Sequence, residues 1–160
     1  MRLRYTATLA LAALLAFSVP AVADTGFVAN INSAQEVPAN TSTATGNGYF
    51  VLNNAQTSLS YNISFTGLTG NHTAAHIHGP AAPGVNAGVR FTLSLGGGAS
   101  GNFAGNWTIP PGDVTSLLNQ LLYVNIHTAT YPGGEIRGQI VLDATPTSAT
   151  TWGRIKQLYR

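Results

Sequence analysis

Two histidines in the segment AAHIHGPA are spaced so that they could bind a metal ion together. Alternate side chains of a β-strand point to opposite faces, so His76 and His78 leave the core together, about 7 Å apart, if Ile77 faces inward. His127 alternates with apolar neighbours in the same way. Three imidazoles from two neighbouring strands are a reasonable coordination shell for Cu(II) or Zn(II). His72, on the loop leading into the first strand, is a candidate fourth ligand.

Further polar residues accompany this predicted histidine face. The alternation that points His127 away from the core does the same for Asn125, Glu135 and Arg137. Glu36, in the segment AQEVP, either joins this face or fixes a strand end through hydrogen bonds. We expect all of these side chains to lie close together if their segments are neighbours in one sheet.

The same residues fit a second interpretation, in which the histidines form a hydrogen-bonded cluster that is structural or contacts a ligand. A zinc enzyme needs an open coordination position and a general base, and Glu135 is the only candidate base nearby. Redox chemistry would also need a cation, such as Arg137, to draw in an anion. No serine lies in the G-x-S-x-G setting of a nucleophile. A binding or structural role is therefore favoured over an enzyme.

Short alternating apolar stretches separated by Gly, Pro and Asn are typical of an all-β protein. We predict an antiparallel Greek-key sandwich or barrel of about eight strands. Its core includes Leu122, Val124, Ile126, Ile136, Ile140 and Leu142. The segment PPGDVTSLLNQLL predicts one short crossover helix with Asp113 as its N-cap. The predicted strands cover residues 26–32, 46–52, 58–65, 74–78, 89–95, 101–109, 121–128 and 135–142.

The N-terminus has the features of a secretory signal peptide covering residues 1–23. Two arginines precede an apolar run, and Ala21 and Ala23 form an A-x-A cleavage signal. The run is too short for a transmembrane anchor, which needs about 20 residues. Cleavage near Ala23 predicts a secreted, periplasmic or otherwise extracytoplasmic protein. The chain has no cysteine, so a thiolate metal site is excluded and stability must come from packing and backbone pairing.

Charge argues against nucleic acid as a partner. Residues 24–150 contain two arginines and five acidic residues, a net charge of −3, and no basic cluster that could follow a phosphate backbone. We expect residues 24–145 to form the folded domain. Residues 146–160 form a linker and a short, basic, amphipathic tail, in which Trp152, Ile155 and Leu158 could share one helical face. This tail is either a frayed end or a segment that docks to a partner or to an anionic envelope surface.

Several of these segments resemble the CHRD domain family, which is named after a repeated domain in chordin. The resemblance is carried by VANINSAQEVP, GYFVLN, LSYNISFTGLTG, AAHIHGPAAPG and LYVNIHTATYPGGEIRGQI, and it spans about residues 26–143. It implies a secreted β-sandwich-like module and says little about activity. A looser likeness to copper/zinc superoxide dismutases rests on the H-x-H strand and the strand order.

Two functions are therefore open. The first is a secreted, non-enzymatic module that binds a protein, a glycan or a surface polymer through its polar histidine face. The second is a copper or zinc protein with a superoxide-dismutase-like histidine site, active in metal handling or redox chemistry. The four potential N-glycosylation sites, at Asn40, Asn62, Asn71 and Asn106, matter only in a host that glycosylates secreted proteins.

Overall fold

The structure is a computed structural model that describes residues 23–93 and 97–144. Within these residues the chain forms nine strands, one short 3-10 helix and one α-helix. The predicted signal peptide and the C-terminal tail lie outside the described residues. The elements are β1 (Thr25–Asn32), η1 (Ser33–Gln35), β2 (Thr45–Leu52), β3 (Ser58–Thr66), β4 (His72–His78), β5 (Val89–Thr92), β6 (Gly101–Thr108), α1 (Pro111–Leu118), β7 (Tyr123–Thr128), β8 (Ile136–Gln139) and β9 (Val141–Leu142).

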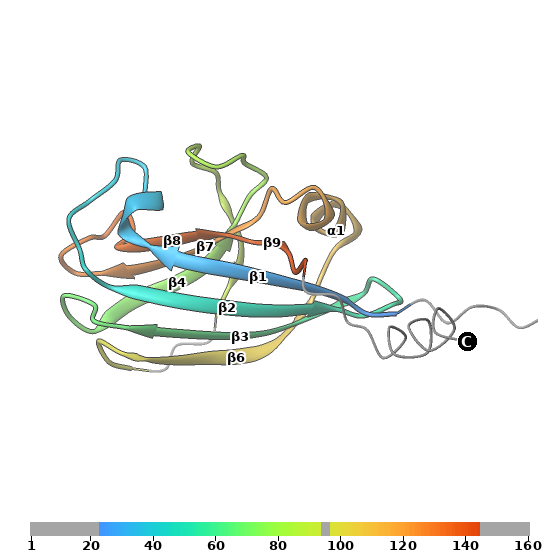
Figure 1. Ribbon diagram of the computed structural model, residues 1–160, viewed down its shortest axis with the longest axis horizontal. Helices are drawn as coiled ribbons and strands as arrows, with labels where there is room; N and C mark the ends of the chain where they lie inside the picture. The colour runs from blue at the N-terminus through green and yellow to red at the C-terminus, as the bar shows by residue number, and fades with distance from the viewer. Residues whose placement is uncertain (1–22, 94–96, 145–160) are drawn as a thin grey trace, which may run out of the picture.

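The strands form one antiparallel sheet that curls into a nearly closed barrel, as Figure 1 shows. Neighbouring strands follow the order β5-β4-β7-β8-β1-β2-β3-β6, and β9 pairs with β1. In Figure 1, β1, β2, β3 and β6 lie in front of β4 and β7. The ring of Phe91 on the edge strand β5 contacts Tyr61 of β3 and Trp107 of β6, so the two ends of the sheet pack against each other across the core. The all-β prediction is confirmed.

The core follows from strict alternation along the strands. In β2 every second residue is buried, and β3 continues the same pattern. The predicted core residues Leu122, just before β7, and Val124 and Ile126, on β7, each have no exposed surface. Leu142 is an exception, because it is 45% exposed. The last predicted strand is interrupted at Ile140 and continues as β9, so the inward-outward alternation does not extend to its end.

The α-helix connects β6 to β7, which lie in opposite halves of the sheet, so it is the predicted crossover. Its N-cap is Pro110 and not Asp113. Asp113 lies within the first turn, where a negative charge interacts favourably with the helix dipole. It is buried and pairs with Arg90 of β5 through two hydrogen bonds of 2.6 and 3.1 Å. This ion pair attaches the helix to the edge of the sheet.

Candidate metal centre

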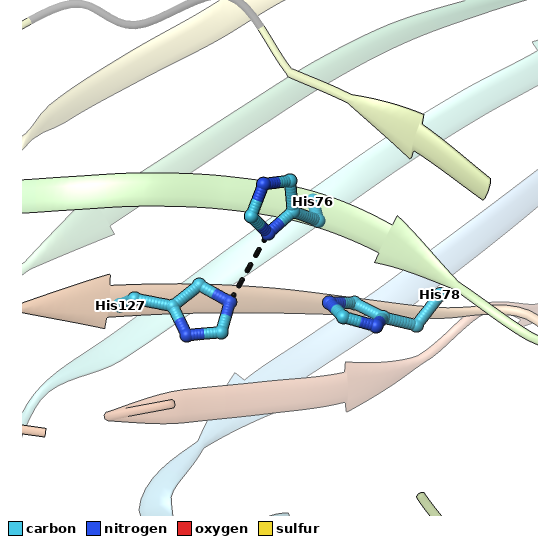
Figure 2. Close-up of side chains that lie close together, drawn as sticks. All are labelled: His76, His78 and His127. Atoms are coloured by element: carbon cyan, nitrogen blue, oxygen red, sulfur yellow. Dashed lines mark hydrogen bonds between the residues drawn. The ribbon is translucent and has the colours of Figure 1, made fainter. Parts of the chain in front are cut away.

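Three histidines from β4 and β7 meet on the face of the sheet that points away from the core, as Figure 2 shows. The two strands are neighbours, with His76 opposite Asn125 and Ala74 opposite His127. The Nδ1 atom of His76 lies 3.2 Å from the Nε2 atom of His127. One ring nitrogen from each of His76, His78 and His127 lies within 4.8 Å of the others.

This face is covered, although the alternation predicted that it points outward. All six residues of β7 are buried, and His78 and His127 are each only 9% exposed. Two segments contact it: residues 79–88, here named the covering loop, bond His78 through Ala87, and the turn 129–135 bonds His127 through Pro132. His76 is half-buried and is therefore the member of the cluster most open to solvent.

Backbone carbonyl groups of these two segments fix the protonation of two imidazoles. The Nδ1 atom of His78 lies 3.0 Å from the carbonyl oxygen of Ala87, and Nδ1 of His127 lies 3.1 Å from that of Pro132. A carbonyl oxygen can only accept, so both Nδ1 atoms carry the proton. In the neutral ring each Nε2 atom then carries a lone pair and no proton.

The lone pair on His78 has no partner. Its Nε2 atom is buried and makes no hydrogen bond. The Nε2 atom of His127 accepts a hydrogen bond, so Nδ1 of His76 must be the donor between those two rings. A metal ion could replace that proton, because the other nitrogen of the half-buried His76 ring can take it up.

Burial keeps the three imidazoles neutral, which is the form that binds metal. Burial lowers the pKa of His76, and it is also the largest influence lowering the pKa values of His78 and His127. The hydrogen bonds to Ala87 and Pro132 act against burial but do not overcome it. At neutral pH the cluster therefore offers uncharged nitrogen donors.

The spacing of the nitrogens is close to that of a coordination shell. Nitrogens bound at 2.0–2.1 Å in a tetrahedral zinc site lie about 3.3 Å apart. The 3.2 Å separation of His76 and His127 already has this value. The three nitrogens lie within 4.8 Å of one another, so His78 would have to move closer to complete a three-nitrogen site. Within residues 23–93 and 97–144 the group consists of three histidines without an acidic side chain, so an ion held there would need water or another donor as its fourth ligand.

Arg137 lies near the cluster, but its guanidinium is engaged by Tyr123 and by residues 85 and 86 of the covering loop. It is 1% exposed, and its guanidinium donates hydrogen bonds to the Val85 carbonyl oxygen and to Asn86. Its Cζ atom lies 3.5 Å from the ring centre of Tyr123. Arg137 therefore holds the covering loop down and is not placed to draw an anion from solution.

Glu36 and Asn125 lie next to Arg137 on the same face. Asn125 Nδ2 is 3.5 Å from a Glu36 oxygen, while the other Glu36 oxygen and Asn125 Oδ1 are buried without partners. Burial raises the pKa of Glu36 to about 7, although the nearby Arg137 charge opposes this. A Cβ atom on Gly134 would clash with the side chains of Asn125 and Glu36, and the φ of Gly134 is +134°, so this turn needs glycine.

The structure does not bring Glu135 or His72 to the histidine cluster. Glu135 is fully buried and accepts hydrogen bonds from Ser42, Thr69 and Thr128. Because both oxygens of Glu135 accept these hydrogen bonds, Glu135 does not serve as the general base predicted for the cluster. His72 is in β4 itself, where it packs edge-on against Phe65 and Phe103 and bonds the Gly98 carbonyl oxygen.

Sequence reasoning missed three contributors to the site: the Tyr123 ring and the carbonyl groups of Ala87 and Pro132. Tyr123 could have been found, because it alternates with His127 and so shares its face. The carbonyl groups carry no sequence signal, since every residue has one. Only the path of the two covering segments selects which carbonyls meet the imidazoles.

Comparison with known proteins agrees with this architecture. Residues 27–140 match the family model described as CHRD domain. No curated protein and no solved structure matches the chain. Among the described residues, no helix has the length and apolar character needed to cross a membrane. The family match covers most of the chain, including both strands that carry the histidine cluster, and this protein therefore belongs to the CHRD domain family.

Proposed function

We propose that this protein is a non-enzymatic, extracytoplasmic binding module whose ligand is a transition-metal ion held by His76, His78 and His127. The observation that carries the proposal is the buried Nε2 atom of His78, which has no hydrogen-bond partner. A buried polar atom without a partner costs free energy, and such atoms call for an explanation such as an ion or a water molecule. The neighbouring nitrogens of the other two histidines favour an ion.

Cu(II) is the preferred ion, with Zn(II) as its competitor. Imidazole suits both metals, and a given site with nitrogen donors generally binds Cu(II) more tightly than Zn(II). His78 and His127 also donate their single N–H, on Nδ1, to a carbonyl oxygen, as metal-binding histidines almost always do. A hydrogen-bonded cluster without metal is the competing function, but it does not account for the unpartnered nitrogen.

Calorimetric titration of the metal-free protein residues 24–160 with Cu(II) and Zn(II) tests this function. We expect one Cu(II) ion per chain, bound more tightly than Zn(II), and at least a 100-fold loss of affinity in the double variant His76→Ala with His78→Ala. The control is His72→Phe, which removes the fourth histidine but keeps a ring against Phe65 and Phe103. Equal binding by the double variant, or no binding by the wild type, would contradict the proposal.

Glu135, the candidate base from the sequence, accepts hydrogen bonds from three neighbouring side chains, and this favours a binding role over catalysis that would use it. An extracytoplasmic location is supported by the signal-peptide features of residues 1–23. The mass of the mature protein is the check on that location, and we expect it to begin at Asp24.

We also propose that residues 146–160 dock to a partner or to an anionic envelope surface through Trp152, Ile155 and Leu158. Deletion of residues 146–160 is expected to change the cellular fraction in which the protein is found. The thermal midpoint of the domain should stay within about 2 °C, because this proposal gives the tail a docking role and no part in the folded core. A large drop in the midpoint would show instead that the tail packs on the domain.

A further inference from the structure

Tyr123 forms the middle layer of a three-layer stack beside the metal centre. Its ring is parallel to the imidazole of His78, with ring centres 5.1 Å apart and an angle of 9° between the planes. The guanidinium of Arg137 lies over the Tyr123 ring at 3.5 Å. The stack follows from the sheet register, because β7 runs between β4 and β8 and places Tyr123 directly opposite His78. The plane of the His78 ring is thus set by Tyr123.

The hydroxyl group of Tyr123 acts on His78 by a second route, through the backbone of the covering loop. It accepts a hydrogen bond from the Ala87 N–H at 3.0 Å and lies 3.3 Å from the Ala87 carbonyl oxygen, to which it can donate. That carbonyl oxygen accepts the Nδ1–H of His78. One tyrosine therefore holds both the ring of His78 and the acceptor that determines which nitrogen of the ring is free.

We propose that Tyr123 is a positioning residue for the metal ion, and that it keeps His78 in the tautomer and ring plane that present Nε2 to the ion. This inference rests on the proposed metal-binding function and assigns a role to a residue outside the three ligands. Groups that orient a ligand from behind typically change metal affinity by 10–100-fold when they are removed. Tyr123 belongs to this class because it contacts His78, a proposed ligand, and Ala87, the residue whose carbonyl oxygen that ligand bonds.

Arg137 supports the same arrangement from the far side of the stack. Its two hydrogen bonds to residues 85 and 86 hold the covering loop immediately before Ala87. The cation over the Tyr123 ring also gains from the negative face of the aromatic system. The stack therefore connects the histidine cluster to the covering loop. We expect residues 85–87 to be well ordered whenever His78 keeps its proton on Nδ1.

The test uses Tyr123→Phe, which removes the hydroxyl group and keeps the stacked ring. Nitrogen NMR of the metal-free protein reads the His78 tautomer directly. We expect a single tautomer with the proton on Nδ1 in the wild type, and a mixture of both tautomers in Tyr123→Phe. The Kd for Cu(II) should rise about tenfold in this variant. Electron paramagnetic resonance should show fewer equivalent imidazole nitrogens on the copper.

Tyr49→Phe is the matched control, because it removes the same group from a side chain that is 63% exposed on β2. It should change neither the tautomer nor the Kd. Tyr123→Leu removes the ring as well and should weaken Cu(II) binding further than Tyr123→Phe. An unchanged His78 tautomer in folded Tyr123→Phe, or an unchanged Kd, would overturn the positioning role while leaving the metal function intact. If the wild type bound no copper, the metal function itself would fail, and the tautomer measurement would still report on Tyr123.

Discussion

At the scale of single residues, the pKa values of two buried glutamates near the turn 129–135, Glu36 and Glu135, are shifted in opposite directions. Glu36 has one oxygen without a partner, and burial raises its pKa to about 7. Burial acts in the same direction on Glu135, but hydrogen bonds from Ser42, Thr128 and Thr69 outweigh it and lower the pKa of Glu135. Desolvation therefore dominates one carboxyl group and hydrogen bonding dominates the other.

The raised pKa of Glu36 predicts that Glu36→Gln stabilises the protein in alkaline solution. Between the ordinary value of 4.5 and about 7, the folded state binds a proton that the unfolded state has released. Stability linked to Glu36 is therefore present at pH 4.5 and is lost as the pH rises through 7. We expect Glu36→Gln to gain on the order of 2 kcal/mol relative to wild type between pH 5 and pH 8, measured by urea unfolding. A difference that does not vary with pH would contradict this assignment.

At the scale of elements, Glu135 connects three segments that are far apart in the sequence. Its oxygens accept hydrogen bonds from Ser42 in the β1–β2 connection, Thr69 in the β3–β4 connection and Thr128 at the end of β7. The carboxylate is thus the shared acceptor at one end of the barrel. This role was not predicted, because alternation along the last predicted strand, residues 135–142, placed Glu135 on the histidine face.

Replacement of this acceptor should destabilise the fold with a pH dependence opposite to that of Glu36→Gln. The folded-state pKa of Glu135 is lowered, so its contribution is present above the ordinary value of 4.5 and is lost as the pH falls through the folded-state value. We expect Glu135→Gln to cost about 2 kcal/mol at pH 7, and less at pH 3, in the same urea experiment. An equal cost at both pH values would show that the amide fails for steric reasons alone.

The elements also show how far sequence reasoning reached. Alternation around Ile77 and His127 was enough to place three histidines on one face, because the period of a strand is fixed by its geometry. His72 was expected on the loop before this strand as a candidate fourth ligand. It lies in β4 instead, with a register shift between His72 and Ala74, and its ring packs against Phe65 and Phe103. Irregularities of this kind depend on the pairing with β7 and leave no periodic signal.

At the scale of the whole molecule, barrel closure determines what the site can do. β4 and β7 become neighbours only because the chain crosses between the two halves of the sheet through α1. The covering loop and the turn 129–135 then close over a face that alternation alone would expose to solvent. The short alternating apolar stretches predicted a sandwich or barrel, whereas the burial of the site and the fixed tautomers of His78 and His127 depend on the path of these two loops.

The central claim is that His76, His78 and His127 hold one metal ion, and the most direct measurement is a crystal structure of the copper-loaded protein with anomalous scattering data at the copper edge. We predict a single strong anomalous peak about 2.0–2.2 Å from Nδ1 of His76 and from Nε2 of His78 and His127. The Nδ1 atoms of His78 and His127 should still contact the carbonyl oxygens of Ala87 and Pro132. A peak elsewhere on the chain, or no peak within about 3 Å of these nitrogens, would contradict the claim.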